Sequence, residues 1–374
     1  MEKQKSIPGK SEKKIGDLLI SSLWNWSRSN PYRTKFFLRI CFRFLFSSIK
    51  RAYMRIKIGS NIPSVLAISP TMHCNYNCIG CYSRDRINDG ELTTEELDSI
   101  LTDAGRLGFS TVVVTGGEPF MRSDILQMML KHRNLLFVTI TNGSLITPEI
   151  AEIISESGNI IILVSIEGFV EDTDLRRKEG AHETAVGIFK YLYDAGVFFG
   201  FAATNTTVNI ENLGSDDFFN QMIGYGCAVG FFSEYVPCGT NPRFDWVLSE
   251  SQREIFRKRI IEVRNKGGIV IVQFPQDEYG EKNICSAAGR ASIHINSQGD
   301  VEPCPFVPIS RENIRKGGLV SACKSPFMRA IRERPELLQR KNLACSLFEH
   351  FEEIKNLSRQ FENQSDQNAD FKSH

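Results

Sequence analysis

Short runs of apolar, mostly β-branched residues recur through the middle of the chain, separated by segments in which apolar residues repeat at helical spacing. The runs are Val65–Ser69, Val112–Thr115, Phe137–Thr141, Ile160–Ile166, Phe198–Thr204 and Val229–Tyr235. Strands that alternate with helices predict parallel βαβ units. Six such units predict an α/β fold built on a partial (βα)6 TIM-type barrel. In barrels of this kind, chemistry is located at the C-terminal ends of the strands.

Two helix starts are marked by capping boxes, in which a Ser or Thr is followed three residues later by Glu or Gln. Thr93–Glu96 opens a helix that we expect to end near Leu107, and Ser249–Gln252 opens one that we expect to end near Asn265. A further strand is predicted at Ile269–Phe274. The polar residues from 360 onward are expected to fray.

An N-terminal helical arm is predicted over residues 15–57, after a polar start that we expect to be disordered. Its segment Phe36–Phe46 is strongly apolar, yet Lys35, Arg39, Arg43 and Lys50 recur at helical spacing. The segment is too short and too charged to span a bilayer. Two interpretations remain open: residues 35–57 lie on a membrane surface as a basic amphipathic helix, or they pack their aromatic face on the body of the protein.

Composition and charge narrow the class of protein. The chain has 374 residues, of which 41% are hydrophobic and 24% charged, as in globular proteins generally. Residues 1–60 hold 14 Lys and Arg against 3 Asp and Glu, whereas the remainder holds 31 against 41. A basic arm on an acidic body suggests a surface contact. We expect no nucleic acid partner, and no P-loop or Rossmann glycine pattern occurs.

The ten cysteines suggest metal binding more than disulfides, because the chain is long and its start has no secretory signal. We therefore expect a cytoplasmic protein, with peripheral membrane contact as an open alternative. Three of them, Cys74, Cys78 and Cys81, are spaced C-x3-C-x2-C directly after the first predicted strand. Three thiolates leave one iron of a cubane cluster without a protein ligand. A zinc knuckle or three unrelated thiols are the alternatives.

At this spacing the three cysteines resemble the cluster loop of the radical S-adenosylmethionine (SAM) enzymes. The resemblance implies a [4Fe–4S] cluster whose open iron binds SAM, and an electron donor such as flavodoxin or ferredoxin. It also implies cleavage of SAM to a 5′-deoxyadenosyl radical that abstracts hydrogen from a substrate. One departure is that Gly80 stands before the third cysteine, where the family often has an aromatic residue.

Further strand ends resemble the SAM-binding motifs of the same family. The second strand ends in a GGEP motif, which in the family contacts the SAM amino group. Arg176 or Arg177 would pair with the SAM carboxylate, and Arg177 is favoured; an exposed basic turn is the alternative. The resemblance implies the cofactor-binding residues Gly116, Gly117, Glu118, Pro119, Asn142, Ser165, Glu167 and Arg177.

The sixth predicted strand leads toward the side on which a substrate would bind. Its end carries Glu234, Tyr235 and Cys238, any of which could donate a proton or relay a radical. Cys238 could equally be an inert small hydrophobic residue. The catalytic residues are therefore an open question.

A second set of cysteines lies near the C-terminus. Cys285, Gly299 and Cys304 are spaced C-x13-G-x4-C around a predicted β-hairpin, and Cys345 and Cys323 complete the set. The spacing resembles the opening of the SPASM extension of radical SAM enzymes, whose further cysteine run is absent here. A shortened, twitch-like extension implies one auxiliary [4Fe–4S] cluster on Cys285, Cys304 and Cys345, with Cys323 as a fourth ligand or a free thiol. A zinc ribbon is the alternative.

The sequence therefore predicts a radical SAM enzyme, of oxidoreductase or maturase type, that modifies a peptide or protein. Synthesis of a cofactor, tetrapyrrole or other small molecule is the alternative, as is work on a lipid or membrane-bound substrate. A zinc- or cluster-binding adaptor without catalysis is the alternative from another class. The expected parts are a basic arm (1–60), a radical SAM core (61–248), an auxiliary-cluster region (249–350) and a polar tail (351–374).

Overall fold

One sheet of ten strands organises the protein, in the order β10-β9-β8-β1-β2-β3-β4-β5-β6-β7. The computed structural model describes residues 24, 27–28, 31–86, 89–279 and 283–370. Strands β1 to β7 are parallel neighbours, and each predicted strand end is confirmed to within one residue. Their bounds are Val65–Ile68, Thr111–Val114, Leu136–Thr141, Ile160–Ser165, Phe199–Asn205, Val229–Glu234 and Val270–Phe274.

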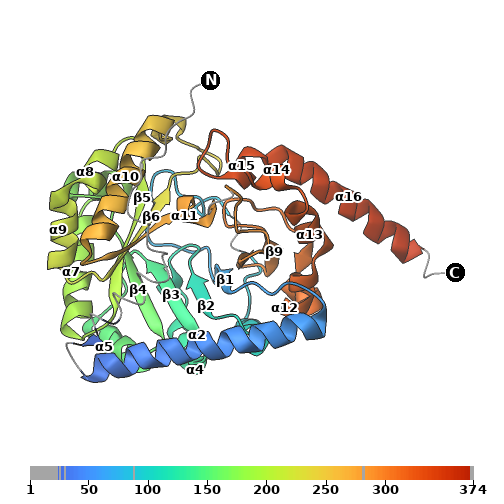
Figure 1. Ribbon diagram of the computed structural model, residues 1–374, viewed down its shortest axis with the longest axis horizontal. Helices are drawn as coiled ribbons and strands as arrows, with labels where there is room; N and C mark the ends of the chain where they lie inside the picture. The colour runs from blue at the N-terminus through green and yellow to red at the C-terminus, as the bar shows by residue number, and fades with distance from the viewer. Residues whose placement is uncertain (1–23, 25–26, 29–30, 87–88, 280–282, 371–374) are drawn as a thin grey trace.

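Helices connect these strands and cover the outer face of the curved sheet (Figure 1). Strand β4 is buried at all six positions, as expected for a parallel strand covered on both faces. The helices of this layer are α3 (Thr94–Leu107), α4 (Ile125–Lys131), α5 (Pro148–Ser157), α6 (Val170–Arg176), α7 (Ala181–Asp194), α8 (Ile210–Gly214), α9 (Asp216–Gly224) and α10 (Glu250–Lys266), with 3-10 turns η1 (Pro119–Met121) and η2 (Phe244–Trp246). Both predicted capping boxes are confirmed, at the starts of α3 and α10.

The C-terminal region extends the same sheet on the other side of β1. Strand β8 (Ser292–Ile295) runs parallel to β1, and β9 (Asp300–Glu302) and β10 (Glu312–Asn313) follow antiparallel. The predicted hairpin therefore lies directly beside the strand that leads into the first cysteine loop. Short helices complete the region: α11 (Gln276–Tyr279), α12 (Ile314–Lys324), α13 (Pro326–Arg332), α14 (Pro335–Leu338) and α15 (Ser346–Glu349).

The last helix, α16 (Phe351–Asp370), corrects one expectation. We expected the polar residues from 360 onward to fray, but helix continues to Asp370. Residues 351–361 still alternate apolar and polar positions at helical spacing, with Ile354 and Leu357 buried in the core. The helix extends away from the body in Figure 1.

The N-terminal arm forms the 28-residue helix α2 (Pro31–Ile58), which crosses the edge of the sheet where the strands begin (Figure 1). Phe37 and Ile40 are buried against apolar residues at the starts of the strands, among them Leu136, Ile161 and Val229. The arm therefore packs part of its apolar surface on the body. The predicted disordered start and the residues 15–23 lie outside the described residues.

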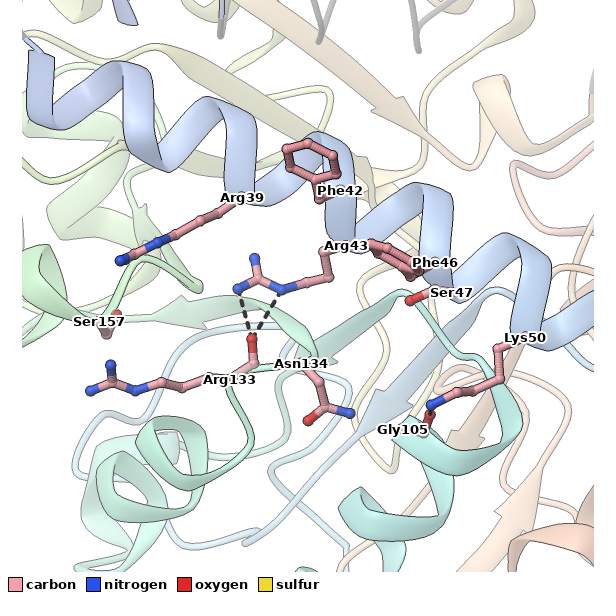
Figure 2. A pocket seen from close by; sticks show the side chains of 10 residues that line it. All are labelled: Arg39, Phe42, Arg43, Phe46, Ser47, Lys50, Gly105, Arg133, Asn134 and Ser157. Carbon is pink, nitrogen blue, oxygen red and sulfur yellow. Dashed lines mark hydrogen bonds between the residues drawn. The ribbon is translucent and has the colours of Figure 1, made fainter.

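Basic side chains of α2 bind backbone carbonyls where the outer helices end. Arg43 donates to the carbonyl oxygen of Arg133 at 2.7 Å and Lys50 to that of Gly105 at 3.2 Å (Figure 2). Arg51 donates to the carbonyl oxygen of Gly108 at 2.9 Å. The C-terminal ends of helices leave carbonyls without intrahelical partners and carry partial negative charge. Some of the positively charged side chains of the arm therefore bind to the body of the protein itself. None of the helices formed by the described residues is long and apolar enough to cross a membrane.

Candidate active site

The first cysteine loop follows the C-terminal end of β1. Cys74 is exposed, whereas Cys78 and Cys81 are partly buried. Burial raises the pKa of Cys74, and Cys78, Glu118 and Cys81 raise it further because each adds negative charge nearby. Cys78 and Cys81 thus lie close enough to Cys74 for their charges to act on its thiol. A bound cation or cluster would relieve this repulsion.

The distances between the three thiols of the first cysteine loop bear on which kind of metal centre they could bind. Among the described residues, no three or more His, Cys, Asp or Glu side chains gather closely enough to hold one metal ion. A single zinc ion would require its thiolates about 2.3 Å away on every side. A [4Fe–4S] cluster holds each thiolate on a different iron and therefore spreads them farther apart. The donor set, three thiols on a loop, is that of a cluster with one open iron.

The glycines of the GGEP motif are required by the cysteine loop itself. A Cβ atom on Gly117 would lie 2.2 Å from the carbonyl oxygen of His73, and one on Gly116 would lie 2.5 Å from that of Thr71. The amide of Gly117 donates to Thr71 at 2.9 Å, and that of Glu118 donates to His73 at 2.8 Å. The implied contact of Gly116 and Gly117 with SAM stays a prediction. In the structure they admit the backbone that leads into Cys74.

Glu118 lies fully inside this site. Its carboxylate accepts from the Thr141 hydroxyl at 2.6 Å, from the amide of Asn142 at 2.7 Å and from the amide of Phe120 at 3.1 Å. Burial raises the pKa of Glu118 despite these donors. A cationic group placed beside Glu118 would therefore be favoured electrostatically, as the resemblance implies for the SAM ammonium.

Glu167, which follows the end of β4, forms ion pairs with two arginines. Its buried carboxylate accepts at 2.5 Å from both Arg176 and Arg177, and at 2.7 Å from the amide of Thr204. The pKa of Glu167 is lowered: burial acts to raise it, but both guanidiniums outweigh that effect. Sequence reasoning placed Glu167 and Arg177 at the site but did not foresee this pair of ion pairs.

The two arginines face different parts of the site. Burial acts to lower the pKa of Arg176, but the charge of Glu167 and then those of Cys78 and Cys81 raise it, so its guanidinium lies near these two cysteines. Burial raises the pKa values of Tyr76 and Glu118, and the charge of Arg177 opposes that effect in both, so Arg177 lies on their side of the site. The Nε atoms of both arginines are buried without a hydrogen-bond partner. Both donors are therefore free to bind an acceptor on a ligand.

The remaining predicted cofactor residues line the same edge of the sheet. Asn142 donates to the side chain of Asn75 in the cysteine loop at 2.9 Å. Ser165 ends β4 and is buried, and Pro119 is the first residue of η1. The buried side-chain oxygen of Asn205, at the end of β5, has no partner. All these positions lie at C-terminal strand ends, as the barrel predicts.

Tyr235 lies against the unusual glycine of the cysteine loop. Its Cε2 atom would be 2.8 Å from a Cβ atom on Gly80, and its hydroxyl accepts from the amide of Arg243 at 2.9 Å. The ring therefore occupies the space that an aromatic residue at position 80 would need. The sequence shows that position 80 lacks the aromatic residue, but it does not show which residue fills the space.

The other two candidates on the substrate side have different surroundings. Glu234 is buried and accepts from Arg253 at 2.5 Å, and Arg253 also donates to the carbonyl oxygen of Asn342 at 2.8 Å. Burial raises the pKa of Glu234, and Arg253 opposes that effect. An ion-paired carboxylate that fastens β6 to the C-terminal region has an evident structural role.

Cys238 lies between the two cysteine groups. Burial raises its pKa to about 12, and the charges of Cys345 and Cys81 both act on it. Its loop is fastened to the first cysteine loop because Thr240 donates to Asp85. The chain spacing between Cys238 and the other cysteines gave no sign of this position.

The structure brings together three of the four C-terminal cysteines. The thiols of Cys304 and Cys345 interact directly, and this interaction raises the pKa of Cys304 and lowers that of Cys345. Burial raises the pKa of Cys285 to about 12, and Cys345 raises it further. Cys323 lies instead on α12, where the charged neighbour is Arg332.

A buried polar chain joins the two cysteine regions. His294 on β8 contacts the Ser69 hydroxyl through Nε2 and Glu302 through Nδ1, each at 2.8 Å, and Arg86 pairs with Glu302 at 3.0 Å. Burial lowers the pKa of His294, so the ring is held neutral. His294 lies fully inside the core.

Comparison with known proteins gives the same picture as the geometry. Residues 68–218 match the model of the radical SAM superfamily. The chain is 27% identical over 286 residues to an AdoMet-dependent heme synthase of Methanosarcina barkeri, covering 69% of this chain and 81% of that protein. It is 26% identical over 313 residues to the mycofactocin maturase MftC of Mycobacterium ulcerans, covering 77% and 82%.

Among solved structures, SuiB of Streptococcus suis bound to S-adenosylmethionine has a TM-score of 0.65 at 18% identity, covering 77% of this chain and 72% of that one. The same protein bound to its precursor peptide SuiA has a TM-score of 0.61. At this identity the likeness concerns the fold. The matched family model and the cysteine loop at the end of β1 agree, and residues 68–218 of this enzyme form a radical SAM domain.

Proposed function

We propose that Cys74, Cys78 and Cys81 bind a [4Fe–4S] cluster and that SAM binds its open iron. When bound, this pair supplies a 5′-deoxyadenosyl radical that abstracts hydrogen from a substrate. The observation that carries the proposal is the meeting of three features at one edge of the sheet. They are the three thiols, the buried Glu118 carboxylate and two guanidiniums with unpartnered Nε atoms.

The residues of the site divide into groups that contact SAM and groups that hold those contacts in place. Glu118 suits the SAM ammonium, and Arg177, whose charge acts on Glu118, suits the neighbouring carboxylate. Glu167 binds both arginines and would fix their direction. Tyr235 is placed beside Gly80 and would supply the aromatic surface that the loop itself lacks. Asn142 and Ser165 remain proposed contacts to SAM.

We further propose one auxiliary [4Fe–4S] cluster on Cys285, Cys304 and Cys345, with Cys238 as the fourth ligand. The first three thiols act on each other electrostatically inside the core. Cys238 is the further thiol whose loop reaches them, because the ion pair of Arg253 ties the end of β6 to residue 342. Cys323 differs from these thiols, because the charged neighbour that acts on it is Arg332 and not another cysteine.

The substrate that we propose is a peptide or protein. Two of the similar proteins support this choice: one is named a mycofactocin maturase, and another is seen bound to a precursor peptide. Tetrapyrrole chemistry is the second candidate, because another relative of similar identity is named a heme synthase. In either case a small electron-transfer protein, such as flavodoxin or ferredoxin, would supply the electron.

We also propose a peripheral membrane contact through residues 35–57 of α2, which exposes large apolar side chains beside lysines and arginines. The arm (1–60), the core (61–248), the auxiliary region (249–350) and the tail (351–374) remain the proposed division of the chain.

SAM cleavage tests the proposed chemistry. Anaerobically reconstituted enzyme is reduced with dithionite in the presence of SAM, and 5′-deoxyadenosine is measured for the wild type, Cys74→Ala and Cys41→Ala. Cys41 is a matched control because it lies on α2 among apolar residues at the opposite edge of the sheet. We expect product from the wild type and the control and none from Cys74→Ala. Retained cleavage in Cys74→Ala would refute the assignment of the cluster loop.

A pair of cysteine variants tests the fourth auxiliary ligand. Cys238→Ala should change the iron content or the electron paramagnetic resonance spectrum of the auxiliary cluster, whereas Cys323→Ala should leave both unchanged. If Cys323→Ala changed them and Cys238→Ala did not, Cys323 would be the fourth ligand and Cys238 would not.

A further inference from the structure

The outer face of α2 is apolar over most of its length. Along the described part of this helix, one stripe of large side chains is 46–85% exposed. The stripe consists of Leu38, Phe42, Leu45, Phe46, Ile49, Tyr53 and Ile56, which recur every three or four residues. Exposed apolar surface of this extent marks an interaction site, and aromatic and aliphatic residues beside lysines and arginines are typical of helices lying in a membrane interface.

Beside this stripe, a cavity of about 470 Å³ lies between α2 and the ends of the outer helices (Figure 2). Phe42 and Phe46 of the stripe form part of its wall. The wall also carries four cationic side chains, and none of its ten residues is acidic. The cations are Arg39, Arg43, Lys50 and Arg133.

The cations of this cavity repel one another. Burial and the nearby charge of Arg39 together lower the pKa of Arg43 to about 10. Figure 2 shows Arg39, Arg43 and Arg133 directed toward the same space. The carbonyls that Arg43 and Lys50 bind are neutral, so they satisfy hydrogen bonds without balancing the charge. An anion in the cavity would balance it, and arginines suit the geometry of a phosphate.

We propose that this cavity binds the phosphate headgroup of an anionic phospholipid, with the acyl chains lying along the apolar stripe of α2. The proposal rests on the membrane contact proposed above and names the lipid chemistry that it recognises. The volume is within the range of small-molecule sites, larger than a phosphate alone needs. The shared wall, Phe42 and Phe46, joins the charged cavity to the stripe, as a headgroup and its chains would require.

The orientation of the enzyme follows from this placement. Helix α2 crosses the edge where the strands begin, whereas the cysteine loop follows the end of β1 (Figure 1). A membrane against α2 would therefore leave the active site on the side away from the bilayer. The lipid would act as a docking partner and not as the compound that is modified.

Vesicle binding of the full chain tests the proposal with a matched pair of variants. Arg39→Gln removes a charge from the cavity, and Lys57→Gln removes one from an exposed position of the same helix outside it. Loss of a hydrogen bond to a charged group should weaken binding to phosphatidylglycerol-containing vesicles about 10- to 100-fold for Arg39→Gln. Loss of surface attraction alone should weaken it about fivefold or less for Lys57→Gln. Iron content serves as the check of folding.

The possible results distinguish the headgroup site from the membrane contact on which it rests. Equal losses in the two variants would refute the headgroup site but keep the membrane contact. Equally tight binding of the wild type to vesicles of phosphatidylcholine alone would also refute the headgroup site. Binding of free inorganic phosphate as tight as that of vesicles would make the cavity a site for a soluble anion. Failure of the wild type to bind any vesicle would refute both proposals and leave the SAM chemistry untouched.

Discussion

The contact between Gly117 and the cysteine loop allows a sharp test of how the fold builds the cluster site. A Cβ atom at position 117 would lie 2.2 Å from the carbonyl oxygen of His73, whereas ordinary contact begins at 3.4 Å. Gly117→Ala therefore requires the backbone next to Cys74 to move by about 1 Å, because both groups are backbone atoms with little freedom. Hydrogen bonds of 2.8 and 2.9 Å join these segments, and such a shift would break both.

The two lost hydrogen bonds should destabilise the loop by about 2 kcal/mol, at about 1 kcal/mol each. We expect Gly117→Ala to fold but to bind less iron and sulfide at the first site after anaerobic reconstitution. Gly187→Ala is the control, because its Cβ would meet nothing within 4 Å in the middle of α7. That change should stabilise the helix by about 0.5–1 kcal/mol. Wild-type iron content in Gly117→Ala would refute the reasoning.

Three further predictions concern stability, measured by urea unfolding of the apoprotein. Glu167→Gln leaves two buried guanidiniums without their carboxylate and should lower the free energy of unfolding by about 3–5 kcal/mol, whereas Asp194→Asn, in an exposed ion pair, should change it by about 0–1 kcal/mol. Below about pH 6.5 an unfolded histidine binds a proton, but burial lowers the pKa of native His294. Stability should therefore fall as the pH drops, and His294→Gln should reduce this slope by up to about 1.4 kcal/mol per pH unit. Thr93→Ala removes a capping box and should cost about 1 kcal/mol. A free energy of unfolding equal to that of the wild type would contradict the assignment of Glu167 or Thr93. A pH slope equal to that of the wild type would contradict the assignment of His294.

The fold was largely predictable, because it depends on local patterns. The strand runs, the capping boxes at Thr93 and Ser249, and the hairpin before Cys304 are each encoded within a few neighbouring residues. Resemblance to a known family then indicated which strand ends would meet. The continuation of α16 beyond residue 360 was missed, since a polar composition conceals a helical period that continues from a buried start.

The contacts inside the site were less predictable, because they join residues that are distant in the sequence. Nothing near Gly80 indicates that Tyr235 fills the space beside it. The proximity of Cys238 to Cys345 likewise depends on how β6 meets the C-terminal region. Both cases show that the sequence pattern specifies strand ends, whereas packing determines which side chains approach them.

Metal content tests the central claim most directly. Iron and sulfide are measured in anaerobically reconstituted wild type and in the triple variant in which Cys74, Cys78 and Cys81 are alanine. One SAM-binding cluster and one auxiliary cluster predict about eight iron per chain in the wild type and about four in the variant, at about four per cubane. Iron content that is unchanged by the triple substitution would contradict the account. About four iron falling to none would retain the SAM cluster and remove the auxiliary one.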